Sequence, residues 1–206
     1  MPLLREKYAD RIDVRIGAEL GFQPYLADYY REFTETYPMD FIIGSAHSVE
    51  GHYVATKLLF QNREDKEAYR AYFEEMLEDV KKIKSYDVLG HMDYMVRYSK
   101  FGVKSYSRDE YWDLIDEILK QVIADGKGIE LNLSGIKYGL GFAHPHPEIL
   151  KRYRELGGEI ITVGSDGHIP EHIGYGFHLA EDILKESGFR YYTEFKSRKP
   201  TFVKIG

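Results

Sequence analysis

The sequence contains no cysteine, which excludes a disulfide framework and a thiolate zinc site. It has no excess of positive charge either, because 28 lysines and arginines stand against 34 aspartates and glutamates, a formal net charge of −6. This balance argues against a nucleic-acid partner. No apolar run approaches the roughly 18 residues of a membrane span, and the opening MPLLREKYADRIDV is too charged for a signal peptide. We therefore expect a cytoplasmic protein without a membrane partner.

What the sequence does contain is a regular alternation of two kinds of segment. Five short apolar runs have the composition of buried strands: residues 13–20, 40–47, 86–91, 127–133 and 158–165. Five longer segments have helical spacing: 24–37, 63–84, 107–126, 146–158 and 170–188. The helix over 107–126 is expected to begin with a capping box from Ser107 to Glu110. The alternation predicts a single α/β domain over residues 1–206 with a mainly parallel sheet.

Polar side chains that can bind metals lie where these apolar runs end. They are Glu19, His47, His91, Asp93, Asn132, Asp166 and His168. The carboxyl ends of parallel strands meet at one edge of a sheet, and such folds carry their chemistry there. One histidine at the end of a strand is usually structural, but imidazoles or carboxylates at four strand ends are hard to explain as coincidence. The pattern therefore predicts a shared site at that edge.

Imidazole and carboxylate ligands without thiolates favour Zn²⁺, Mn²⁺ or Fe. Glu19, His47 and His91 would make a three-ligand site with an open position, as in catalytic metal sites. Asp166 and His168 project to the same side of an extended segment and would hold a second metal nearby. Two ions about 3.5–4 Å apart are a standard arrangement for phosphoester cleavage, in which a metal-bound hydroxide attacks phosphorus in line.

Five motifs occur in order along the chain: IGAELGFQP, DFIIGSAHSVEG, DVLGHMDYMVRY, IELNLSG and IITVGSDGH. In this order and spacing they resemble the polymerase-and-histidinol-phosphatase (PHP) family, in its histidinol-phosphatase branch. The resemblance implies a distorted (β/α)7 barrel with up to three metals at its carboxyl face. It also implies a phosphoric monoester hydrolase of histidine biosynthesis, acting on a small phosphorylated metabolite. By motif, Glu19 would bridge two metals, one of them held by His47 and His91. Asp166 and His168 would serve the other two.

The chain departs from the family pattern at its start. The family's His-x-His motif should precede the strand that ends in Glu19, but none of the 18 residues before Glu19 is a histidine. We therefore expect a barrel incomplete at its N-terminus, with one firmly bound metal at the three-ligand site, weak occupancy of the second site and reduced activity. Because an uncovered strand edge favours pairing with another chain, a homodimer across that edge is a further expectation.

Arg97, six residues after His91, would clamp the substrate phosphate as a bidentate donor, and the alternative is a surface arginine. Asn132 and His144 are further candidates for substrate binding. The stretch HPHP that begins at His144 equally favours a helix entry with extended residues before the prolines. The group that protonates the leaving alkoxide is open between Asp93 and a metal-bound water.

Two other functions fit the same residues. One is a different metallohydrolase on the same barrel, acting on another phosphorylated metabolite or on a nucleotide. The other is a catalytically impaired remnant that binds a metal or a partner without turnover. A phosphatase screen with histidinol phosphate among the substrates separates these possibilities.

Overall fold

A computed structural model describes residues 2–61 and 63–206 of the chain. Its centre is a five-stranded sheet in the order β1-β2-β5-β6-β7, and every neighbouring pair is parallel. The strands are β1 (Gly17–Gly21), β2 (Phe41–Ser45), β5 (Val88–Leu89), β6 (Gly128–Asn132) and β7 (Ile161–Gly164). Each lies within one of the apolar runs or overlaps it, so the predicted α/β class with a mainly parallel sheet is confirmed.

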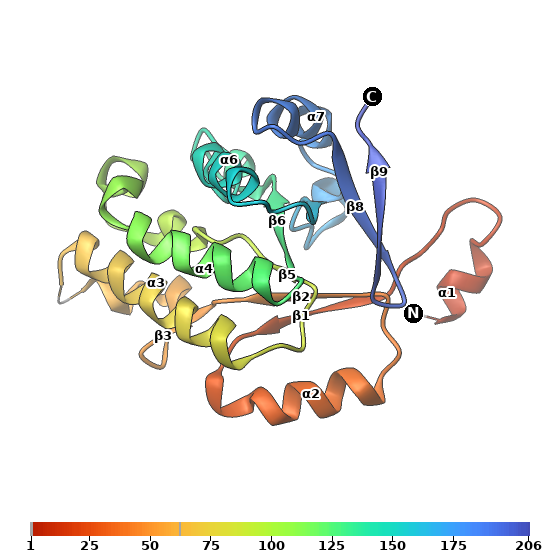
Figure 1. The fold of residues 1–206 in the computed structure, drawn as a ribbon, viewed down its shortest axis with the longest axis horizontal. Coiled ribbons are helices and arrows are strands. Elements are labelled where there is room, and N and C mark those ends of the chain that lie inside the picture. Colours follow the sequence, from red (N-terminus) through yellow and green to blue (C-terminus); the bar gives the residue numbers. More distant parts are fainter. Residues whose placement is uncertain (1, 62) are drawn as a thin grey trace.

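Helices occupy the crossovers between these parallel strands and also the segments before β1 and after β7. They are α2 (Ala27–Thr36), α3 (Asp65–Lys82), α4 (Trp112–Ala124), α6 (Pro147–Glu155) and α7 (Phe177–Glu186), with the short α1 (Pro2–Lys7) and α5 (Ser134–Lys137). Figure 1 shows α3, α4, α6 and α7 side by side along the sheet, with α2 at its lower side in this view. The apolar stripe of α3 is buried as its spacing predicts, for example at Tyr69, Phe73 and Met76. Strand residues such as Ile42, Leu89 and Ile129 complete one hydrophobic core.

The predicted capping box at Ser107 is wrong. Residues Arg108–Glu110 form a 3-10 turn, Ser107 makes no capping hydrogen bond, and α4 begins only at Trp112. The burial of Tyr111, 1% exposed, holds this turn against the core and delays the helix. A reciprocal capping box forms instead at α3, between Glu64 and Glu67. The sequence pattern missed it because glutamate is not a preferred N-cap residue.

The segment 170–188 also begins its helix later than the spacing suggests. Residues Pro170–His172 form a 3-10 turn, and α7 starts at Phe177. Gly174 and Gly176 lie between them with φ of +68° and +75°. Left-handed backbone at two alternate positions is incompatible with a continuous helix, so the helix starts only after the second glycine.

Two hairpins were not among the predicted strands. The small one pairs β3 (Ser48–Val49) with β4 (His52–Tyr53), and the larger one pairs β8 (Tyr191–Lys196) with β9 (Lys199–Lys204), all antiparallel. The turn of the larger hairpin reaches the amino ends of β2 and β5. There Ser197 N–H donates to Asp40 Oδ1 over 3.0 Å, and Arg198 Nε donates to Asp87 Oδ2 over 2.5 Å. The turn of the C-terminal hairpin therefore covers the amino end of the sheet, to the right in Figure 1.

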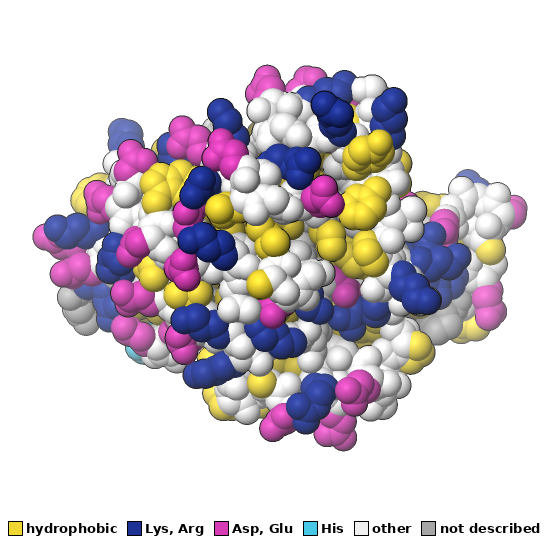
Figure 2. Space-filling model, in the orientation of Figure 1, with side chains coloured by type: hydrophobic (Ala, Val, Ile, Leu, Met, Phe, Trp, Pro, Cys, Tyr) yellow, Lys and Arg dark blue, Asp and Glu magenta, His cyan; other side chains and the backbone are white. Residues whose placement is uncertain are grey.

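The face of the molecule in Figure 2 carries acidic and basic side chains interspersed, without a single basic surface in this view. The net charge of the whole chain is −6. In the part of the chain that the structure describes, none of the helices combines the length and the apolar character that a membrane crossing requires.

Candidate metal centre

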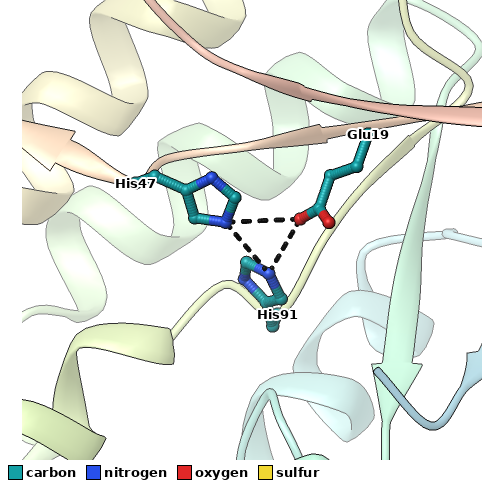
Figure 3. Close-up of side chains that lie close together, drawn as sticks. All are labelled: Glu19, His47 and His91. Carbon is teal, nitrogen blue, oxygen red and sulfur yellow. Dashed lines mark hydrogen bonds and ion pairs between the residues drawn. The ribbon is translucent and has the colours of Figure 1, made fainter. Parts of the chain in front are cut away.

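Three of the predicted ligands meet at the carboxyl end of the sheet. Glu19 lies in β1, His47 follows β2, and His91 follows β5 (Figure 3). The separations are 3.1 Å from Glu19 Oε1 to His91 Nε2, 3.3 Å from Glu19 Oε1 to His47 Nε2, and 3.4 Å between the two Nε2 atoms. They form the one cluster of three or more potential ligand groups within the described residues.

The triangle has the size of a face of a metal tetrahedron. An ion bound tetrahedrally at about 2.0–2.1 Å holds its ligand atoms about 3.3–3.4 Å apart. The three measured edges, 3.1, 3.3 and 3.4 Å, match this spacing. Two imidazole nitrogens and one carboxylate oxygen also suit zinc and its neighbours in the first transition series. The residues therefore fit a divalent metal, of whose four tetrahedral positions these side chains would fill three.

The charges around the triangle keep its carboxylate ionised. Burial opposes ionisation of Glu19, but hydrogen bonds with His47, His91 and Ser45 hold the pKa of Glu19 far below its usual value. The Ser45 hydroxyl donates to Glu19 Oε1 over 2.6 Å. Burial alone would lower the pKa of His91, yet the hydrogen bond with Glu19 and the charges of Glu130 and Asp166 raise it. The ionised carboxylate of Glu19 thus supplies the negative charge that attracts a cation to the triangle.

His91 is held in an unusual backbone conformation, with φ of +20°. Such a conformation persists only where its surroundings fix it. The backbone N–H of His91 donates to Glu130 Oε2 over 3.3 Å. On the other side, the ring of Tyr94 stacks on the imidazole at 4.5 Å and 28°. These two contacts direct Nε2 of His91 toward Glu19.

Glu130 is a residue that the sequence analysis did not select. It lies in the middle of β6, is 4% exposed, and accepts from Asn132 Nδ2 over 2.9 Å. Burial raises its pKa. Gly164 gives it room, because a Cβ at that position would lie 2.1 Å from Glu130 Oε1. The sequence does contain a signal for Glu130, a carboxylate inside the otherwise apolar run KGIELNL. Because an unpaired charge is rarely buried, a carboxylate at such a position indicates polar partners in the core.

Asp166 and His168 approach each other but gather no third ligand among the described residues. Asp166 Oδ1 lies 3.0 Å from His168 Nε2, and the side chain of His168 is 76% exposed. Asp166 has a φ of +49°, a left-handed backbone that is uncommon outside glycine. The structure therefore brings one complete set of three ligands together, and the second pair stands beside it.

Arg97 is not a surface arginine, since its side chain is 12% exposed. Its guanidinium lies 3.7 Å from the centroid of the Tyr138 ring and 5.0 Å from that of Tyr94, and its Nη1 is 3.6 Å from Asp166 Oδ2. Lys137, a second residue that the sequence analysis missed, donates to the carbonyls of Ser165 and Asp166 over 3.0 and 2.9 Å. Two cations thus converge on the Asp166 loop.

Asp93, Asn132 and His144 occupy the core behind the centre. Their exposures are 1, 2 and 0%. Asp93 Oδ1 pairs with His144 Nδ1 over 2.5 Å, and Asn132 uses its amide to bind Glu130 and the N–H of Ser134. His146 caps α6, as the helix-entry interpretation of HPHP requires, by accepting from the N–H of Glu148. The roles predicted for Asp93, Asn132 and His144 in catalysis and substrate binding stay predictions.

The sequence profile of the PHP domain matches residues 3–134, more than half of the 206 residues. The chain belongs to the PHP domain family. The histidinol-phosphatase of Lactococcus lactis is 29% identical over 203 residues, which cover 95% of this chain and 73% of that protein. The probable histidinol-phosphatase of Clostridium acetobutylicum is 32% identical over 167 residues, 81% of this chain and 65% of that protein. The predicted resemblance to histidinol phosphatases is confirmed.

The fold supports the same relationship. The crystal structure of histidinol phosphate phosphatase from Lactococcus lactis, in complex with zinc, L-histidinol and phosphate, superposes with a TM-score of 0.84 at 27% identity. The match covers 97% of this PHP chain and 76% of the other. A putative histidinol phosphatase from Listeria monocytogenes shares the fold with a TM-score of 0.73 at 21% identity. The expected PHP fold is therefore confirmed, and so is a parallel sheet with its polar centre at the carboxyl end.

Proposed function

We propose that this chain is a metal-dependent phosphoric monoester hydrolase with histidinol phosphate as its substrate. The observation that carries the proposal is the triangle of Glu19, His47 and His91, whose edges of 3.1 to 3.4 Å fit one tetrahedral ion. Membership of the PHP domain family and the histidinol-phosphatase relatives supply the reaction class and the substrate. The net charge of −6 argues against a nucleic acid as the substrate.

The proposed roles follow from the positions of the side chains. Glu19, His47 and His91 would hold the divalent metal, with zinc favoured over Mn or Fe by the tetrahedral spacing. When bound, the metal supplies a nucleophile from water and a positive charge for the phosphoryl oxygens. Asp166 and His168 would hold further metal weakly, because the described residues add no third ligand there.

Arg97 is the proposed phosphate clamp. Stacking on Tyr138 leaves the planar guanidinium rigid, so less conformational entropy is lost when it binds a phosphoryl group. The nearby ammonium of Lys137 adds a second positive charge. Burial and the charge of Arg97 lower the pKa of Lys137, and the negative charge of Asp166 opposes this shift. Asn132 and His144 are also proposed for substrate binding. Both are buried, so they would act from beneath the surface that carries Arg97 and Lys137.

The test is phosphate release by the chain after its metal has been stripped and then restored. We expect release from histidinol phosphate with added zinc, none from the stripped chain, and slower release from other phosphomonoesters. His47→Ala is the matched variant that removes one ligand. Release that survives both metal removal and His47→Ala would contradict the metal assignment, whereas zinc-dependent release from another ester alone would correct the substrate.

Two further expectations concern the assembly and the location of the protein. Strands β1 and β7 are the outer strands of the sheet, and alternate residues of β1, Gly17, Glu19 and Gly21, are exposed. We propose that a second copy of the chain covers this edge, which light scattering of the purified protein will check against the mass of 24.0 kDa. The cytoplasmic location and a role in histidine biosynthesis stay predictions.

A further inference from the structure

A buried pair, Asp93 and His144, lies directly behind the metal centre. Both side chains are 0% exposed. Asp93 Oδ1 contacts His144 Nδ1 over 2.5 Å, and Asp93 Oδ2 accepts the backbone N–H of His146 over 2.8 Å. Both carboxylate oxygens therefore have partners inside the core.

Asp93 stands between two functional residues of the chain, His91 and Arg97. The N–H of Tyr94 donates to the carbonyl of His91 over 2.8 Å, and the N–H of Val96 donates to that of Asp93 over 3.0 Å. These bonds start the 3-10 helix Tyr94–Tyr98, which carries Arg97. The ring of Tyr94 then touches both ends, stacking on His91 at 4.5 Å and on the Arg97 guanidinium at 5.0 Å. Whatever fixes Asp93 consequently fixes the metal ligand and the phosphate clamp together.

The contacts of Asp93 belong to a closed ring of polar interactions. The backbone of His144 exchanges two hydrogen bonds with that of Asn132, of 2.6 and 2.8 Å. Asn132 Nδ2 donates to Glu130 over 2.9 Å, and Glu130 accepts the N–H of His91 over 3.3 Å. The ring returns from His91 to Asp93 along the chain. It joins β6 to the His91–Arg97 segment at two points, which explains how the positive φ of His91 is maintained.

We propose that Asp93 is a positioning residue, which acts through the His91–Arg97 segment and donates no proton to the leaving group. This inference rests on the proposed function and decides between the two proton donors that the sequence left open. A proton donor has to come within hydrogen-bond reach of the leaving oxygen. The carboxylate of Asp93 is enclosed, and its two oxygens hold His144 and the N–H of His146. Of the two candidate donors, this leaves a water molecule at the centre.

The experiment compares Asp93→Asn and Asp93→Ala with the parent chain. Zinc affinity is measured by competition with a chromogenic chelator, and the affinity of the zinc-loaded chain for inorganic phosphate by calorimetry. We expect zinc affinity to fall about tenfold in Asp93→Asn, as for other residues that orient metal ligands, and further in Asp93→Ala. Phosphate affinity should fall in the same order because Arg97 moves with the segment. The pH profile of kcat/KM should keep its shape in Asp93→Asn.

Asp87→Asn is the matched control. Asp87 is also a buried carboxylate, 6% exposed, that accepts one backbone N–H and one side-chain donor, but it lies at the opposite end of β5. The Asp87→Asn variant should have a lower free energy of unfolding and unchanged affinities for zinc and for phosphate. Unchanged zinc and phosphate affinities in Asp93→Ala would overturn the inference, and so would loss of the alkaline limb of the pH profile with normal zinc affinity in Asp93→Asn.

The outcome is distinguishable from failure of the proposed function. If the parent chain releases no phosphate from histidinol phosphate, the function fails, while the zinc and phosphate affinities still decide the role of Asp93. If the parent chain binds no zinc, a crystal structure of Asp93→Asn decides instead. Displaced His91 and Arg97 side chains would support the inference, and unmoved ones would overturn it.

Discussion

The two ends of the parallel sheet use carboxylates in opposite ways. At the amino end, Asp40 Oδ2 accepts the N–H of Ile16 over 2.9 Å and pairs with Arg5, and its Oδ1 accepts the N–H of Ser197 over 3.0 Å. At the carboxyl end, Glu19 faces two imidazoles that compete for the same oxygen, and its side chain is 33% exposed. The amino end is saturated with protein partners, and the carboxyl end keeps ligand atoms directed at a common point.

This difference separates stability from chemistry within one sheet. Hydrogen bonds to the ionised form lower the pKa of Asp40 against the effect of burial, so its charge stabilises the folded chain. At the other end, left-handed backbone at His91 and Asp166 adds strain to the functional loops. In parallel α/β folds, the amino end of the strands contributes to stability and the carboxyl end to catalysis. Three substitutions test whether the division holds, and a fourth tests a buried carboxylate that lies at neither end.

The largest effect is expected from His47→Ala. Removing one of three ligands should lower zinc affinity by more than about 100-fold, since the loss of outer partners alone costs 10–100-fold. The fold should persist, because the side chain of His47 is 22% exposed and contributes little to the core. Elemental analysis and circular dichroism of the purified variant provide the measurement. Unchanged metal content would contradict the assignment of His47 as a ligand. The control is His52→Ala, at an exposed histidine nearby.

At the amino end, Asp40→Ala should lower the free energy of unfolding by about 2–4 kcal/mol, because it leaves two backbone N–H groups and Arg5 without their acceptor. Urea denaturation measures the change, and zinc affinity of the folded protein should stay the same. Asp28→Ala, at a side chain that is 89% exposed, should change stability by less than about 0.5 kcal/mol. A fall in zinc affinity comparable to that of His47→Ala would break the division between the two ends.

Arg97→Ala should weaken the binding of inorganic phosphate to the zinc-loaded chain by about 1.5–3 kcal/mol, the range for a hydrogen bond with a charged group. Zinc content should not change, because Arg97 contacts no member of the triangle. Arg97→Lys keeps the charge without the planar fork and should recover part of the loss. Calorimetry measures both variants. Equal phosphate affinity in Arg97→Ala would reduce this residue to a packing role against Tyr138.

The smallest effect is expected at Asp79, a buried carboxylate of α3 that belongs to neither end. Burial, reinforced by Glu75, raises its pKa to about 7. Its unfolded pKa is about 3.9, so the unfolded state ionises first as the pH rises, and this group destabilises the fold increasingly between about pH 4 and pH 7. Asp79→Asn should therefore stabilise the protein at pH 8 by about 1–3 kcal/mol.

The gain from Asp79→Asn should disappear near pH 4, where the aspartate is protonated in both states. Thermal unfolding at several pH values measures it. Glu78→Gln, at the next position and 53% exposed, should show no comparable trend. A stabilisation that does not depend on pH would mean that the carboxyl group itself is not the cause.

The strand ends were predictable because a parallel sheet converts order along the chain into position in space. The three ligands lie at the ends of the apolar runs: Glu19, His47 and His91. Because neighbouring parallel strands end at the same edge of the sheet, these side chains come together there. The five strands and most helices followed for the same reason, because burial repeats with the period of each element. The hairpin of β8 and β9 was missed, since charged residues interrupt both strands, Glu194 and Lys196 in β8 and Lys199 and Lys204 in β9.

The sequence by itself therefore determined the fold class, the family and the three convergent ligands, all of which depend on local pattern and order. Only the tertiary structure decided which polar groups reach the centre and which support it. Asp93 and His144 are 51 residues apart, and Glu130 lies 39 residues from His91, so no local period relates them. A side chain becomes a support or a ligand according to what surrounds it on all sides, and those surroundings come from four different strands and the loops that follow them.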